Sequence, residues 1–74
     1  KEPSHKALTL RGDAWFALGR YDEAIADFTT ARRLDDSVAQ AYFRRAQQRS
    51  QQGDTAGAQA DLAMAQRLNP TIGQ

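Results

Sequence analysis

The sequence nearly repeats itself at a spacing of 34 residues. The matched positions are Gly19 with Gly53, Ala24 with Ala58, Ala26-Asp27 with Ala60-Asp61, Ala31 with Ala65, and Arg33-Leu34 with Arg67-Leu68. A fixed period of this length is typical of stacked-repeat proteins, in which each unit buries apolar surface of its neighbour. The period therefore predicts two copies of one supersecondary unit, which form an interaction surface without reaction chemistry.

Each copy carries start and stop signals for two helices. In the first copy, Ser4 is the expected N-cap of a helix that runs to about Leu18, and Gly19 ends it. The acidic pair Asp22-Glu23 opens a second helix, because negative charge is favoured at the exposed N–H groups of a helix start. We expect this second helix to run to about Leu34.

The second copy repeats these signals. Ser37 is expected to begin its first helix, and Gln40 completes a capping-box pattern with it. Gly53 ends this helix, and Asp54 or the next residue caps a final helix that ends near Leu68. Sustained period-2 alternation is missing from the sequence, so no strands are expected.

These signals predict an all-α fold of four helices, arranged as two tandem antiparallel helix-turn-helix repeats in a short solenoid. The connections are only a few residues long, so consecutive helices must lie antiparallel and in contact. The expected boundaries are a lead-in over residues 1–4, a first repeat over 5–36, a second repeat over 37–70 and a C-terminal tail over 71–74.

An arginine and an aspartate recur 16 residues apart in both copies, as Arg11 with Asp27 and as Arg45 with Asp61. Folding each helix pair about its glycine turn places the arginine roughly opposite the aspartate. We therefore expect two interhelical ion pairs, since arginine suits bidentate pairing at partly buried contacts. Binding of an acidic ligand by these arginines is the weaker alternative.

Composition excludes several classes of function. The net charge is +1 and cysteine is absent, so disulfides and thiolate metal sites are ruled out. His5 is the single histidine, and no apolar run approaches the roughly 20 residues that span a bilayer. We expect no enzyme activity, no cofactor or metal, and no membrane span. The sequence does not indicate a cellular compartment. Because Lys1 is not Met, we expect a soluble domain from a larger protein.

The recurring residues resemble the tetratricopeptide repeat, whose pattern is W-x₂-L-G-x₂-Y, then A-x₃-F, then P, over 34 residues. The matching positions are Leu8, Arg11, Gly12, Trp15, Ala24, Phe28 and Asp36 in the first copy, and Tyr42, Arg45, Ala46, Arg49, Ala58, Leu62 and Pro70 in the second. The second copy departs further from the pattern, with Thr55 and Gly57 where the first has Tyr21 and Glu23. A glycine inside a helix costs up to about 1 kcal/mol relative to alanine.

The resemblance implies that the first helix of each pair lines a concave side, where partners bind as extended peptides. A helical wheel supports such a face, because one set of residues is not needed to close the helix pairs. Phe16 and Phe43 are its candidate anchors, although packing between repeats is an equally good interpretation of both. The predicted binding residues are Lys6, Thr9, Leu10, Asp13, Phe16, Gln40, Phe43, Arg44 and Gln47.

Some members of the family hold the C-terminal carboxylate of a chaperone with lysine, asparagine and arginine. This chain has Thr9 and Asp13 where lysine and asparagine are expected, and Arg44 where a second asparagine is expected. Asp13 would repel a carboxylate, so we expect no such recognition. Arg44, Arg45 and Arg49 fall on different helix faces, so we expect no nucleic-acid partner.

The leading hypothesis is a module or scaffold that binds a protein or peptide segment on its concave side. The alternative is an assembly element that stacks through its terminal helices, with Leu62 and Met64 on the outer face of the last one. Two repeats are fewer than the three that usually make a stable solenoid. The isolated chain is therefore expected to be an excised part of a longer array, to form a homo-oligomer, or to exchange helices with another copy.

Overall fold

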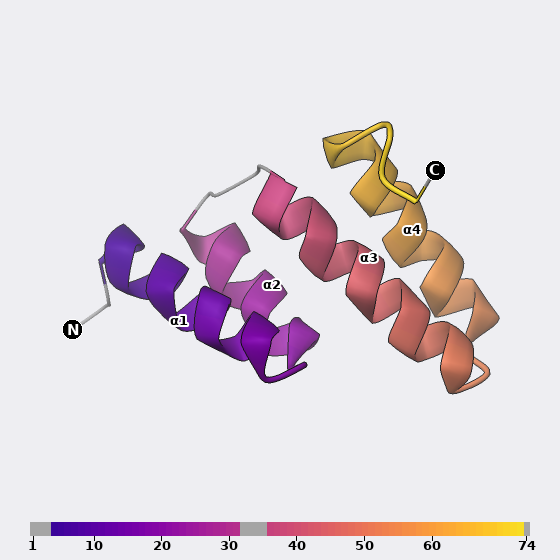
Figure 1. The fold of residues 1–74 in the computed structure, drawn as a ribbon, viewed down its shortest axis with the longest axis horizontal. Coiled ribbons are helices and arrows are strands. Elements are labelled where there is room, and N and C mark those ends of the chain that lie inside the picture. The colour runs from indigo at the N-terminus through magenta and orange to yellow at the C-terminus, as the bar shows by residue number, and fades with distance from the viewer. Residues whose placement is uncertain (1–3, 32–35, 74) are drawn as a thin grey trace.

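The computed structural model describes residues 4–31 and 36–73, and this part of the chain forms four helices (Figure 1). In chain order they are α1 (His5–Ala17), α2 (Tyr21–Thr30), α3 (Asp36–Gln51) and α4 (Thr55–Leu68). The contacts join α1 to α2, α2 to α3, and α3 to α4, so α1 and α4 lie at opposite ends of the array. The predicted all-α fold of helix-turn-helix units is confirmed.

The two glycine turns have the same backbone geometry. Gly19 has a φ of 78° and Gly53 a φ of 85°, in the left-handed region that glycine enters without penalty. The N–H of Arg20 donates to the carbonyl of Trp15 at 2.9 Å, and the equivalent bond from Asp54 is 2.8 Å long. These are Schellman motifs, which end a helix and satisfy its last carbonyls. The period thus recurs in the hydrogen bonds as well as in the sequence.

The helix starts also follow the sequence closely. The Ser4 side chain accepts a hydrogen bond from the N–H of Ala7 at 3.1 Å, as expected for an N-cap. At α4 the cap is Asp54, which accepts from the N–H of Gly57 at 3.0 Å. Each cap satisfies one N–H group that has no partner inside its helix.

Two predicted boundaries differ from the structure. The helix α2 ends at Thr30, and the expected end at Leu34 lies outside the described residues. The helix α3 already includes Asp36, so the prediction that Ser37 begins it was wrong by one residue. An acidic side chain in the first turn is stabilised by the helix dipole. The Asp36 carboxylate also accepts a 2.7 Å hydrogen bond from Asn69.

The main core joins the two hairpins. It is formed by buried residues of α2 and α3 and is flanked by half-buried aromatic rings of α1 and α3. Its buried members are Ala24, Ile25, Phe28, Val38 and Ala41. Because these residues come from both repeats, neither hairpin buries its apolar face without the other.

A second, smaller core lies between α3 and α4. Ala39 and Ala65 pack there against Ile72, which is only 6 % exposed. The described part of the C-terminal tail, residues 71–73, turns back onto this hairpin. Leu62 is half-buried and Met64 is 36 % exposed, so the tail covers only part of the apolar surface.

Candidate functional site

A pocket of about 170 Å³ opens between α1, α2 and α3. Phe16 and Phe28 provide its apolar surface, and polar side chains from α1 and the start of α3 surround them. The polar lining residues are Asp13, Asp36, Ser37 and Gln40. Three of the predicted binding residues, Asp13, Phe16 and Gln40, therefore meet in one pocket although they come from different repeats.

A second pocket, of about 360 Å³, lies between α3 and α4. It is lined by Phe43, Ala46, Gln47, Ser50, Thr55, Ala58, Gln59 and Leu62. Two predicted binding residues, Phe43 and Gln47, are thus placed here, apart from the first pocket. Of the remaining four predicted residues, Thr9 is half-buried, whereas Lys6, Leu10 and Arg44 are exposed and line neither pocket. Arg44 donates to the side-chain oxygen of Gln47 at 3.3 Å.

Both candidate anchors also contribute to packing. The Phe16 ring meets the Tyr21 ring edge-on at a centroid distance of 5.3 Å and packs against the main core. Phe43 packs against the small core that contains Ile72, and Gly73 lies close to its ring. Each phenylalanine therefore has a packing role and a face that lines a pocket, so the two interpretations of these residues do not exclude each other.

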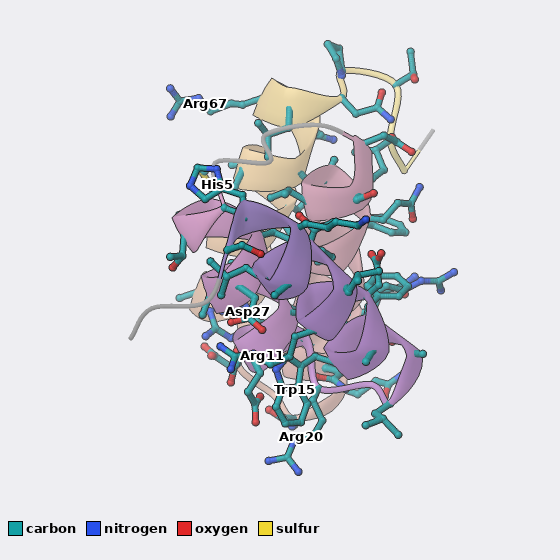
Figure 2. The ribbon with its side chains drawn as sticks, turned by 90° about the vertical axis from the view of Figure 1, so that its left-hand side faces the viewer. His5, Arg11, Trp15, Arg20, Asp27 and Arg67 are labelled. Carbon is teal, nitrogen blue, oxygen red and sulfur yellow. The ribbon has the colours of Figure 1, made fainter. Side chains whose placement is uncertain are left out.

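The first of the predicted ion pairs is formed by Arg11 on α1 and Asp27 on α2. Nε and Nη2 of Arg11 donate to the two carboxylate oxygens at 2.7 and 2.8 Å. Figure 2 shows these two side chains together, with Trp15 and Arg20 next to them. The hydrogen bond from Arg11 lowers the pKa of Asp27 below its ordinary value, against the opposing effect of burial. The predicted structural pair is confirmed.

The second pair, between Arg45 and Asp61, is more extensive. Nε and Nη2 of Arg45 donate to Asp61 at 2.9 and 2.8 Å, and Nη1 donates to Asp22 of α2 at 2.9 Å. Arg49 approaches Asp61 to 3.3 Å, and the Arg45 guanidinium lies over the Tyr42 ring. The hydrogen bond to Asp61 raises the pKa of Arg45, which stays charged.

The contact between Arg45 and Asp22 links the two repeats, and the sequence did not indicate it. Gln48 adds a second link, donating to the backbone carbonyl of Gly19 at 3.1 Å. Residue spacing predicts partners within one hairpin, where a glycine turn fixes the geometry. Residue spacing does not specify how one hairpin is rotated against the next. The 34-residue period therefore did not predict these two contacts.

The described residues offer little for metal or membrane chemistry. Over residues 4–31 and 36–73, no group of three or more histidine, cysteine, aspartate or glutamate side chains is placed to hold a metal ion. Within the same ranges, none of the helices combines the length and apolarity required for a membrane crossing. His5 is exposed at the start of α1. What the chain presents is a set of helical surfaces with two pockets.

Comparison with known proteins gives one family. Residues 5–37 match the tetratricopeptide repeat, which covers α1, α2 and the beginning of α3. No curated protein and no solved structure matches the chain. Residues 38–73 lie beyond the family match but form a second hairpin with the same glycine turn and the same arginine–aspartate pair. Residues 5–37 are therefore similar to the tetratricopeptide repeat, and a helical hairpin of the same plan follows them.

Proposed function

We propose that this chain binds an extended protein or peptide segment along the side formed by α1 and α3. Tetratricopeptide repeats generally mediate protein–protein interaction, and this chain carries one. The observation that supports this particular surface is the first pocket, where the predicted residues Asp13, Phe16 and Gln40 are brought together from two repeats. A partner that fills it contacts both hairpins at once.

The size of the first pocket favours a side chain over a small molecule. Its volume of about 170 Å³ lies below the range of roughly 300–1,000 Å³ that is usual for ligand pockets. An aromatic floor surrounded by polar groups is also the usual form of an interface hot spot. A single apolar side chain of a bound segment therefore fits against Phe16, and polar groups at the rim can fix the main chain beside it.

The charges of the same pocket exclude one class of segment. Asp13 and Asp36 both line it, and two carboxylates at the rim disfavour a terminal carboxylate of a partner. The proposal therefore concerns an internal segment of a protein, whose backbone carries no terminal charge.

The test uses peptides selected by the 74-residue chain from a phage-displayed library of random 12-residue sequences. Gln40→Tyr adds a bulky ring on α3 at the first pocket, and Gln66→Tyr adds the same ring to exposed α4, outside both pockets. We expect Gln40→Tyr to raise the Kd of the selected peptides about tenfold or more in calorimetry, while Gln66→Tyr leaves it unchanged. Equal Kd values for the two variants, both folded by circular dichroism, would contradict the proposed surface.

The second candidate function is assembly through the end of the array, and the second pocket favours it. Ala58 and Leu62 line this open pocket, whereas the equivalent Ala24 and Phe28 of the first repeat are buried beneath α3. If identical chains cover it, the mass from light scattering should rise with concentration, and Leu62→Gln should restore the monomer. A constant monomer mass up to millimolar concentration would count against self-assembly.

A further inference from the structure

The charge of the first pocket differs from the charge of the whole chain. The chain has a net charge of +1, whereas the pocket is lined by two aspartates, Asp13 and Asp36. Among the described residues, no lysine or arginine lines it. Of the two basic residues predicted for this side of the molecule, Lys6 lines neither pocket, and Arg44 donates to Gln47. The first pocket is therefore a local negative site on a nearly neutral molecule.

The second pocket occupies the equivalent place in the second repeat, and it lacks this charge. Three lining residues of the two pockets are related by the 34-residue period: Asp13 with Gln47, Phe16 with Ser50, and Phe28 with Leu62. Every described residue that lines the second pocket is uncharged. The two repeats thus share the position of the pocket but not its charge, so the negative charge is a property of the first pocket and not of the repeat plan.

Both carboxylates are placed where a cation can approach them from solvent. Asp13 is exposed on α1, and Asp36 is exposed in the first turn of α3. The hydrogen bond that Asp36 accepts comes from the side-chain amide of Asn69, which carries no charge and so does not neutralise the carboxylate. An ionised carboxylate has about four lone-pair sites, so one that already accepts a hydrogen bond can accept others.

The aromatic floor of the pocket adds to the attraction for a basic side chain. The Phe16 ring is half-buried and lines the pocket. The face of an aromatic ring attracts a guanidinium or ammonium group. The methylene stem of lysine or arginine also packs on apolar surface while its charged head stays in water. An apolar floor with an acidic rim therefore matches a basic side chain better than an acidic or a neutral polar one.

A side-chain cation is also a better match than a metal ion. Calcium takes about six to eight oxygen ligands. Over residues 4–31 and 36–73, the two aspartates belong to no group of three or more side chains that could hold a metal ion. A lysine or arginine brings its own hydrogen-bond donors and needs only one or two acceptors from the pocket.

We propose that the segment bound on the side of α1 and α3 carries an arginine or lysine within two residues of the apolar side chain that fills the first pocket. The apolar side chain lies against Phe16, and the basic one lies at the rim formed by Asp13 and Asp36. This inference rests on the proposed function and adds the chemistry by which one segment is preferred over another. Complementary charge of this kind speeds association and rejects segments of the wrong sign.

The first part of the test reads the peptides that the 74-residue chain selects from the phage-displayed library. We expect arginine or lysine within two residues of a large apolar residue about three times as often as in the unselected library. In the tightest peptide, that basic residue is then replaced by a neutral residue of similar shape, citrulline for arginine or acetyl-lysine for lysine. The replacement should raise the Kd about 3- to 10-fold in calorimetry at low salt, where surface charges are screened least.

The second part removes the charge from the pocket. Asp13→Gln introduces the residue that α3 carries at the matching position, so the change suits the helix. We expect it to raise the Kd of the basic peptide about 3- to 10-fold and to leave the Kd of the neutral peptide nearly unchanged. Asp36→Asn keeps an oxygen for the bond from Asn69 and should act in the same direction. Glu23→Gln is the matched control, because it removes the same charge from α2 outside both pockets and should change neither Kd.

The Gln40→Tyr variant separates this inference from the proposed function. If Gln40→Tyr weakens binding but Asp13→Gln changes the Kd of the basic and the neutral peptide by the same factor, the surface is correct and the preference for a basic residue is wrong. Selected peptides without an excess of arginine and lysine would overturn the preference as well. If Gln40→Tyr leaves the Kd unchanged, both the surface and the preference fail.

Discussion

Asp61→Ala is expected to leave most of the chain unfolded at 25 °C. The Asp61 side chain is 4 % exposed and accepts two hydrogen bonds from Arg45 and a contact from Arg49. Removing it leaves positive charge near the interface of the two repeats without its main partner. Breaking a buried ion pair in this way costs about 3–5 kcal/mol, and the core of a chain this small supplies about the same amount. Urea unfolding followed by circular dichroism measures the loss.

The equivalent change in the first repeat provides the matched control. Asp27→Ala removes the same bidentate contact, but the Arg11 side chain is 55 % exposed and water can solvate it afterwards. We expect Asp27→Ala to cost about 1–3 kcal/mol. Replacing both partners of the second pair, as Arg45→Met with Asp61→Leu, should cost less than Asp61→Ala alone. If Asp61→Ala and Asp27→Ala lower the free energy of unfolding by equal amounts, burial does not determine the strength of these ion pairs.

Gly12→Ala is expected to lower the free energy of unfolding by about 1–3 kcal/mol through overpacking. A Cβ atom at Gly12 would lie 2.6 Å from Cε1 of the Phe28 ring, and that ring is 1 % exposed in the main core. The ring is packed in the main core and borders the first pocket, so relieving the clash requires the ring to shift from its packed position. Alanine gains up to about 1 kcal/mol in helix propensity over glycine, so the measured loss is the clash minus this gain.

The second repeat shows how this clash is avoided. Ala46 stands at the position of Gly12, and Leu62 stands at the position of Phe28. Phe28→Leu combined with Gly12→Ala reproduces that pairing. The double variant should therefore lose less free energy of unfolding than the sum of the losses of the two single variants. Urea unfolding of the four proteins gives this coupling directly. Strictly additive losses would contradict the compensation between the two positions.

The structural features that depend on a single hairpin could be predicted from the sequence. The glycine turns at Gly19 and Gly53 require a positive φ that few other residues adopt, so their positions fix both helix pairs. The spacing of Arg11 and Asp27 then fixes their contact across the turn. The bond between Arg45 and Asp22 was not predictable in this way, because it depends on how two hairpins rotate against each other.

The candidate site shows the same limit. A helical wheel assigned Asp13 and Gln40 each to a face of its own helix, but it could not show that the two side chains line one pocket. It also could not reveal that the ring of Phe43 is packed against the C-terminal tail, because the tail has no periodic pattern. Wheel angles describe one helix, whereas pockets depend on its neighbours.

The most direct test of the proposed interaction surface is a titration of the labelled 74-residue chain with a selected peptide, followed by amide chemical shifts in NMR. The proposal predicts that the largest shift changes lie on α1 and α3, at residues such as Thr9, Gln40 and Gln47. Amides of exposed α4 residues such as Ala63 and Gln66 should change little. Shift changes concentrated on α4, with α1 and α3 unaffected, would contradict the account.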